Sequence, residues 1–195
     1  MSEYSYKTVY EGGVGEIEEK KSRFIATVIP IESEEEAVDF FNRTKKKYWD
    51  ARHNCSAFTL GRKHELTRCN DDGEPSSTAG KPILGQINSN DLTYILIIVV
   101  RYYGGVNLGT GGLIVAYKTA AAAAIDNSEV EVRQVEELVK YDFPYVMMND
   151  VMRVVKDMQP RIVKQEYDNT CSITLSIRKS EAGTLRGRLS KLSFE

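Results

Sequence analysis

A short apolar run at residues 94–100, Tyr-Ile-Leu-Ile-Ile-Val-Val, constrains the fold of this chain more than any other segment. Polar and apolar side chains do not alternate in it, so a strand formed here must be covered on both faces. Its isoleucine and valine side chains favour a strand over a helix, and the run is far shorter than the roughly 20 residues of a membrane-spanning helix. It therefore predicts a central, fully buried strand in a fold that mixes helices and strands.

The segment that follows this strand changes to helical periodicity. Apolar side chains recur along one helical face at Leu113, Ala116, Tyr117, Ala120, Ala121 and Ala124. Because alanine is small and favours helices, we expect this helix to lie close against the sheet. The glycine-rich residues 104–112 then join the strand to the helix and place backbone amides near the helix N-terminus, where an anion can bind.

Two interpretations of this glycine-rich turn remain open. Neither nucleotide-binding motif fits, because no lysine follows Gly109 as a Walker loop requires, and Ile114 stands where a dinucleotide fingerprint needs a glycine. The glycines can supply positive φ angles and close packing. Alternatively, their amides can bind a phosphate or another anion.

A second polar turn, at residues 71–82, precedes the buried strand. Its carboxylates at Asp71, Asp72 and Glu74 fit either a divalent cation or ordinary turn chemistry. Thr78 is predicted to cap the helix that follows. We expect the two turns to meet in one cleft beside the buried strand, because polar loops next to a rigid strand usually present binding groups.

Strands are also predicted within residues 6–31, and a Ser33-x-x-Glu36 capping box predicts a helix start. Residues 53–60 and 64–70 are predicted to form a hairpin. Basic and aromatic side chains near the helix end and the hairpin can contact nucleic-acid phosphate or simply be solvated. These side chains are Arg43, Lys45, Lys46, Lys47, Tyr48, Trp49, Arg52, Arg62, Lys63, His64 and Arg68.

Composition limits the classes of function. The 195 residues carry a net charge of −2, so any nucleic-acid surface must be a local patch. Residues 1–134 contain 16 basic and 19 acidic residues, and the remainder contains 10 and 9. The sparse cysteines, without a Cys-x-x-Cys pair, indicate a cytoplasmic protein without disulfides or a zinc site. No apolar segment follows Met1, so we expect no signal peptide.

A Cys–His catalytic pair can be considered at His53 and Cys55, which share one face of the predicted hairpin. Nucleophilic catalysis also needs a third group that orients the base, and the sequence nominates none. The simpler interpretation is a hydrogen-bonded strand histidine.

Three segments resemble the IMPACT family, and within it the bacterial members of the YigZ type: ARHNCSAFTLG from residue 51, DDGEPSSTAGKPI from residue 71 and VVRYYGGVNLGTGGLIVAY from residue 99. The resemblance covers the whole chain and implies an α+β protein with two α/β sandwich domains, at residues 1–134 and 135–195. It implies that the first is similar to the second-domain fold of the fifth small-subunit ribosomal protein. It implies that the second is ferredoxin-like and similar to domain V of elongation factor G. Eukaryotic relatives are implicated in translational control under amino-acid starvation.

Residues 135–195 are predicted to follow a β-α-β-β-α order, with Ser180 as the cap of the last helix. A complete ferredoxin-like module has a fourth strand, and we expect too few residues after this helix to form one. Basic side chains on or near the helix can either contact phosphate or increase solubility. They are Arg178, Lys179, Arg186, Arg188 and Lys191.

The leading hypothesis is a non-enzymatic, translation-associated protein that binds RNA, the ribosome or a translation factor, without a cofactor, a metal or a membrane. The alternative is an enzyme or binder acting on a phosphorylated small molecule through the glycine-rich turn. A third possibility is a protein-interaction module with purely structural glycines. The predicted ligand- or RNA-binding residues are Arg52, His53, Asp72, Glu74, Ser76, Ser77, Lys81, Arg101, Tyr103, Gly104, Gly105, Asn107, Gly109, Thr110, Gly111 and Gly112.

Overall fold

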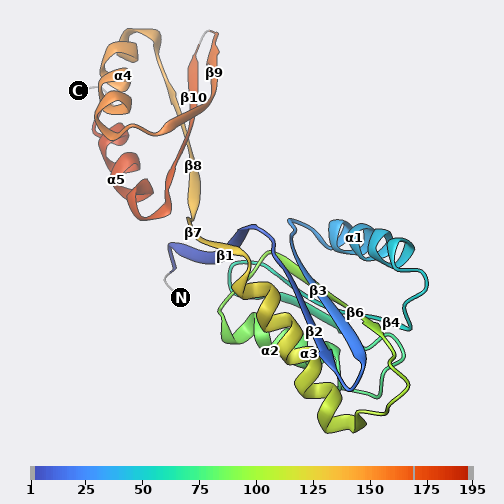
Figure 1. Cartoon of the computed structure of the whole chain (residues 1–195). Coiled ribbons are helices and arrows are strands. Elements are labelled where there is room, and N and C mark those ends of the chain that lie inside the picture. Colours follow the sequence, from blue (N-terminus) through green and yellow to red (C-terminus); the bar gives the residue numbers. More distant parts are fainter. Residues whose placement is uncertain (1–2, 169, 193–195) are drawn as a thin grey trace. The chain divides into compact units, whose positions relative to one another are not determined.

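The structure is a computed structural model that describes residues 3–168 and 170–192 (Figure 1). The chain forms two compact units. The N-terminal unit is Tyr6–Arg133, and the C-terminal unit is Gln134–Glu195 together with Met1–Ser5. The described residues contain five α-helices and three β-sheets, so the mixed α and β architecture is confirmed.

The N-terminal unit is built on a five-stranded antiparallel sheet with a central strand, β6, that is buried from residue 95 to residue 101. Val99 of this strand pairs with Ala26 on one side and with Cys55 on the other. The predicted central buried strand is therefore confirmed. In spatial order the strands are β2 (Val14–Glu19), β3 (Ser22–Pro30), β6 (Ile95–Tyr102), β4 (His53–Leu60) and β5 (Leu66–Asn70).

Helices cover both faces of this sheet (Figure 1). Ile97 and Val99 of β6 pack into a core with α2 and α3, whereas Leu96 and Ile98 pack into a second core with α1. Successive residues of a strand point to opposite faces, which is why β6 is apolar at every position from residue 95 to residue 100. The helices are α1 (Glu34–Lys47), α2 (Gly80–Ser89) and α3 (Gly109–Asp126).

The long helix α3 lies close to the sheet because its inner face carries mainly alanine. All six residues of its predicted buried stripe are buried, together with Ile125. Gly15 of β2 permits the close approach, since a Cβ atom there would lie 2.4 Å from the backbone nitrogen of Ala124. Any larger residue at this position would force the helix away from the sheet.

The start of α2 is capped differently from the prediction. Thr78 does not cap it, because its hydroxyl donates to the carbonyl oxygen of Pro75 at 2.6 Å. Asp71 Oδ1 instead accepts hydrogen bonds from the amides of Ala79 (3.1 Å) and Gly80 (2.8 Å). The turn folds back on the helix, so a carboxylate eight residues before Ala79 supplies the cap.

Other local predictions for this unit are confirmed. The Ser33 hydroxyl accepts a hydrogen bond from the Glu36 amide at 3.2 Å, as the capping box predicts. Strands β4 and β5 pair as the expected antiparallel hairpin. A further short strand, β7 (Glu129–Gln134), pairs with β1 (Ser5–Glu11) in a separate two-stranded sheet.

The C-terminal unit follows the predicted β-α-β-β-α order. Its sheet has the order β8 (Glu136–Phe143), β10 (Cys171–Arg178) and β9 (Arg161–Tyr167). A short turn of 3₁₀ helix, η1 (Tyr145–Met147), precedes the helix α4 (Met148–Met158). The last helix is α5 (Lys179–Ser190).

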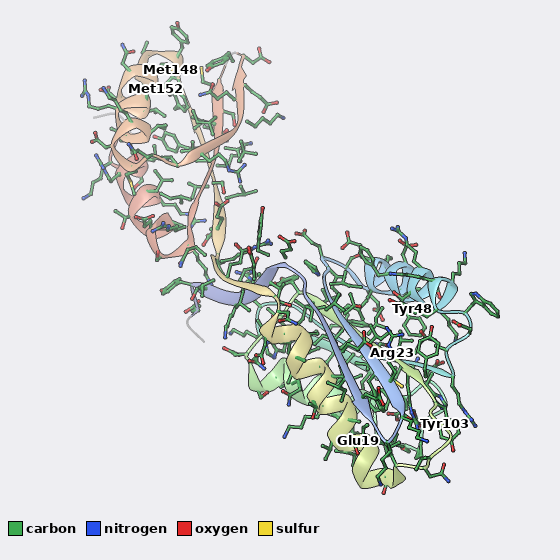
Figure 2. The ribbon with its side chains drawn as sticks, viewed as in Figure 1. Glu19, Arg23, Tyr48, Tyr103, Met148 and Met152 are labelled. Atoms are coloured by element: carbon green, nitrogen blue, oxygen red, sulfur yellow. The ribbon has the colours of Figure 1, made fainter. Side chains whose placement is uncertain are left out.

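Apolar residues of β8 and β10 form the core of the C-terminal unit with α4 and α5. Met148 and Met152, labelled in Figure 2, are partly buried against it. The predicted Ser180 cap is wrong, because Arg178 occupies the N-cap position and makes no side-chain cap bond. Residues 193–195, which bear on a fourth strand, lie outside the described residues.

Candidate functional site

A cleft lies at the C-terminal end of β6, where the two polar turns of the N-terminal unit meet. Its volume is about 460 Å³. Residues 73–75 of the acidic turn and residues 107–110 of the glycine-rich turn both line it. The expectation that the two turns share one cleft beside the central strand is therefore confirmed. Its other lining residues are Arg52, His53, Arg101, Tyr103 and Leu113.

Strand pairing brings the basic side chains of the cleft together. His53 at the start of β4 lies directly opposite Arg101 near the end of β6. The Arg52 amide donates to the Arg101 carbonyl oxygen at 3.1 Å. Directly opposed residues in an antiparallel pair have Cβ atoms about 5 Å apart, so residues distant in sequence become neighbours here.

A buried ion pair holds the wall of the cleft. Arg101 Nη1 donates to Glu74 Oε1 at 2.6 Å, and the Tyr117 hydroxyl donates to the same oxygen at 2.7 Å. The Glu74 side chain is 3% exposed and that of Arg101 is 7% exposed. A buried charge is tolerated only when it is paired and hydrogen-bonded. The pair therefore fixes the guanidinium of Arg101 and the acidic turn relative to each other.

Beneath this pair, Tyr117 of α3 and Cys55 of β4 extend the polar network into the core. The Cys55 sulfur lies 3.3 Å from the Tyr117 hydroxyl and 3.0 Å from the carbonyl oxygen of Asp71. Burial raises the pKa of both the Cys55 thiol and the Tyr117 hydroxyl well above their ordinary values. A thiolate is the reactive form of cysteine, so Cys55 is poorly suited to the catalytic pair considered with His53.

His53 has a defined ring orientation. Its Nδ1 lies 2.8 Å from the backbone oxygen of Asp72. Because a carbonyl oxygen can only accept, Nδ1 carries the proton and donates. Its Nε2 lies 3.8 Å from Glu74 Oε2. His53 thus links the acidic turn to the wall of the cleft.

Each carboxylate of the acidic turn already has hydrogen-bond donors. Burial opposes ionisation of Asp71, but its three backbone donors, the amides of Gly80, Ser77 and Ala79, outweigh burial and lower the pKa of this carboxyl. These contacts argue against the divalent-cation interpretation of the turn. In addition, no group of three or more His, Cys, Asp or Glu residues in the described parts of the chain could hold a metal ion.

Asp72 is not among the residues that line the cleft. Its carboxylate accepts from Lys45 Nζ at 3.1 Å and from the Asn54 amide at 2.8 Å. Lys45 therefore ties the C-terminal end of α1 to the acidic turn. The structure thus gives Asp72 a structural contact, and the site role predicted for it stays a prediction.

The structure supports the first interpretation of the glycine-rich turn, that its glycines supply positive φ angles and close packing. A Cβ atom at Gly104 would lie 2.1 Å from the carbonyl oxygen of Lys21, so only glycine fits there. Gly105 and Gly109 have φ angles of 84° and 73°, in the region that favours glycine. Leu108 occupies the N-cap position of α3 without a side-chain cap bond. The first amides of the helix therefore lack intrahelical partners.

The ring of Tyr103, which is labelled in Figure 2, lies close to two arginine side chains. The guanidinium carbons of Arg52 and Arg101 lie 5.2 and 5.6 Å from the centre of its ring. Both distances are within the range of cation–π attraction. The Tyr103 hydroxyl also donates to Asn107 Oδ1 at 3.2 Å, which closes the glycine-rich turn onto β6.

Half of the predicted site residues line the cleft and half do not. The lining set is Arg52, His53, Glu74, Arg101, Tyr103, Asn107, Gly109 and Thr110. The others shape the turns or lie nearby: Asp72, Ser76, Ser77, Lys81, Gly104, Gly105, Gly111 and Gly112. Sequence reasoning missed the polar role of Tyr117, although a tyrosine in a buried helical stripe signals a hydroxyl that needs a partner.

A second polar surface lies at the C-terminal end of α1. Trp49 is 83% exposed, and it borders a shallow depression with Asn42, Lys45 and Lys46. In the C-terminal unit, several of the basic residues for which phosphate contact or solubility was left open pair with carboxylates. Those pairs are Lys179 with Glu3, Arg186 with Glu137 and Arg188 with Asp157.

The fold and the cleft define a class of two-unit α/β proteins whose candidate binding site lies in the first unit. The chain belongs to the IMPACT family: the family model described as the Impact N-terminal domain matches residues 20–125, a range that contains every residue lining the cleft. The membership predicted from the three sequence segments is confirmed. None of the described helices is both long and apolar enough to cross a membrane.

Particular relatives extend the match over both units. IMPACT family member YvyE of Bacillus subtilis (strain 168) is 32% identical over 190 residues, which cover 97% of this chain and 88% of the relative. IMPACT family member YigZ of Escherichia coli (strain K12) is 29% identical over 178 residues, covering 89% and 86%. A crystal structure of a hypothetical protein superposes with a TM-score of 0.75 at 27% identity, covering 98% of this chain and 94% of that one.

Proposed function

We propose that this protein is a non-enzymatic, cytoplasmic binding protein that acts in translation and contacts the ribosome through its RNA. Membership in the IMPACT family supports the link to translation, which the family resemblance implies. We also propose the closer fold assignments that the resemblance implies. The N-terminal unit would share the second-domain fold of the fifth small-subunit ribosomal protein, and the C-terminal unit would be ferredoxin-like and similar to domain V of elongation factor G.

The observation that carries the RNA contact is the exposed aromatic and basic surface of the N-terminal unit. Trp49 exposes 83% of its surface beside Lys46. Three residues further on, Arg52 stacks on Tyr103 at the cleft. Aromatic rings that stack on unpaired bases, next to cations that contact phosphate, are typical of single-stranded nucleic-acid binding.

The chemistry of the cleft supports binding rather than catalysis. The one cysteine near it, Cys55, is buried, and its pKa is raised by that burial. The carboxylates of Asp71 and Glu74 accept hydrogen bonds from backbone amides, Arg101 and Tyr117. These groups already serve to hold the turns in place.

Co-sedimentation with purified ribosomes at increasing salt tests the proposal. Trp49→Ala should weaken binding roughly 5- to 160-fold, because a stacked base contributes about 1–3 kcal/mol. Arg52→Ala should weaken binding and lower the dependence of log affinity on log salt by about one unit. Tyr145→Ala, at a tyrosine 72% exposed in the C-terminal unit, is the matched control and should leave affinity unchanged. Absence of binding at low salt, or equal affinity in all variants, would refute the proposal.

A further inference from the structure

The cleft contains hydrogen-bond donors that stacking on RNA does not use. They come from two separate features, the guanidinium of Arg101 and the first turn of α3. We propose that these donors form a site for a phosphate monoester, carried either by a small molecule or by the end of an RNA. This inference goes beyond the proposed ribosome contact, because phosphate binding in the cleft does not require Trp49.

Arg101 supplies the first set of donors. Its side chain is 93% buried, yet of its N–H groups only Nη1 donates to a described residue, Glu74. The Nε atom is buried without a hydrogen-bond partner in the described structure. An unpaired donor of a buried charged group is costly. Arg101 also lines the cleft, so a ligand bound there could accept from this guanidinium.

The first turn of α3 supplies the second set. The helix has 18 residues, and neither Leu108 at its N-cap nor an acidic residue in its first turn offers an acceptor. Gly109 and Thr110 of this turn line the cleft, and a Cβ atom added at Gly109 or Gly111 would meet nothing within 4 Å, so the space beside the turn is open. Partner-free amides together with the helix dipole favour an anion at this position.

The charge of the lining also favours an anion. Two arginines, Arg52 and Arg101, face one carboxylate, Glu74, among the lining residues. Because the buried Glu74 already balances Arg101, Arg52 and the helix dipole leave the cleft net positive. The acidic residues Asp71 and Asp72 do not line the cleft.

The arrangement of donors selects phosphate over a simple carboxylate. A phosphate monoester has three terminal oxygens in a tetrahedral arrangement, so it can accept from the guanidinium and from the helix amides at the same time. Glu74 holds the guanidinium in place before the ligand arrives. The volume of about 460 Å³ also leaves room for a sugar beyond the phosphate, and lies within the range of small-molecule sites.

Isothermal titration of the full chain with ribose 5-phosphate and with ribose tests the site. A 5′-phosphorylated oligoribonucleotide and its unphosphorylated counterpart form the second arm. Thr110→Asp places a negative charge at the proposed anion position, while aspartate in a first helical turn stabilises the helix. Thr119→Asp makes the same change nine residues further along the exposed side of α3, roughly 13 Å away along the axis.

The phosphorylated member of at least one arm should bind more tightly than its counterpart. Thr110→Asp should reduce that affinity roughly tenfold or more, because like charges in a site repel strongly, whereas Thr119→Asp should leave it unchanged. Binding in only one arm identifies the source of the phosphate. Equal affinity with and without the phosphate, or an equal loss in both variants, overturns the inference. Phosphate binding without ribosome binding would refute only the proposed function.

Discussion

Replacing Glu74 by glutamine tests how much the N-terminal unit depends on the buried ion pair. The change keeps the shape of the side chain and leaves an oxygen to accept from Tyr117, but it removes the charge that balances Arg101. Both side chains are more than 90% buried and joined at 2.6 Å. Breaking a buried pair typically costs about 3–5 kcal/mol, because the remaining charge has no counterpart.

We expect Glu74→Gln to lower the free energy of unfolding by about 3 kcal/mol, at the low end of that range because the acceptor oxygen is retained. This loss corresponds to a fall in midpoint temperature of roughly 10 °C for a unit of this size. Arg101→Gln should cost a similar amount. The double variant contains neither charge, so its loss should be smaller than the sum of the two by at least about 1 kcal/mol.

Urea unfolding measures these losses, with deuterium exchange at the β6 amides reporting on the N-terminal unit alone. Glu32→Gln is the control, because the Glu32 side chain is 81% exposed. It should change stability by no more than about 0.5 kcal/mol. Losses at Glu74 and Arg101 that simply add, or that are no larger than the control, would refute the claim that the pair acts as one buried unit.

Two further predictions concern acid stability and thiol reactivity. The lowered pKa of Asp71 contributes stability above about pH 3.9, the ordinary value in the unfolded chain, and this contribution is lost as the pH falls through the lower folded-state pKa. Asp71→Asn should therefore lower the free energy of unfolding by about 1–2 kcal/mol at pH 7. Below about pH 4 the variant should lose stability less steeply than the unchanged protein. Urea unfolding at several pH values measures both effects, and an equal dependence of stability on pH in the two proteins would contradict this prediction. An aromatic disulfide reagent should label one thiol of the folded protein quickly, that of Cys69, because Cys55 and Cys171 are buried. Fast labelling of two or three thiols would show that the core is not closed.

The pattern of polar and apolar residues was sufficient to predict the central strand and the helix that packs against it. Burial of β6 on both faces follows from its own residues, and the alanine stripe of α3 has only one arrangement that buries it. The position of the cleft was also predictable in outline, since two polar turns flank one buried strand. The sequence patterns that indicate these features are themselves local.

Contacts between distant segments could not be predicted in the same way. Thr78 has the side chain of an N-cap, yet Asp71 caps α2 because the turn brings its carboxylate to the helix amides. Strand register decides that His53 faces Arg101. The hydrogen bond from Tyr117 to Glu74 joins residues 43 positions apart, and such a pairing depends on the packing of α3 against the sheet.

The basic residues of the C-terminal unit show a further limit of sequence reasoning. Arg188 and Lys179 fit a phosphate surface by type and spacing, but each pairs with a carboxylate at 2.8 Å. Whether a cation is available to a ligand depends on which acidic side chains the fold places next to it. In the N-terminal unit, by contrast, Arg52 has an aromatic neighbour and no ion pair among the described residues.

Our central claim is that a ligand binds in the cleft at the start of α3. Nuclear magnetic resonance of the ¹⁵N-labelled chain, titrated with ribose 5-phosphate, tests it most directly. We expect the largest shifts at the amides of Gly109, Thr110 and Gly111 and at the side-chain Nε of Arg101. Shifts confined to other surfaces, or no shifts at saturating ligand, would contradict it.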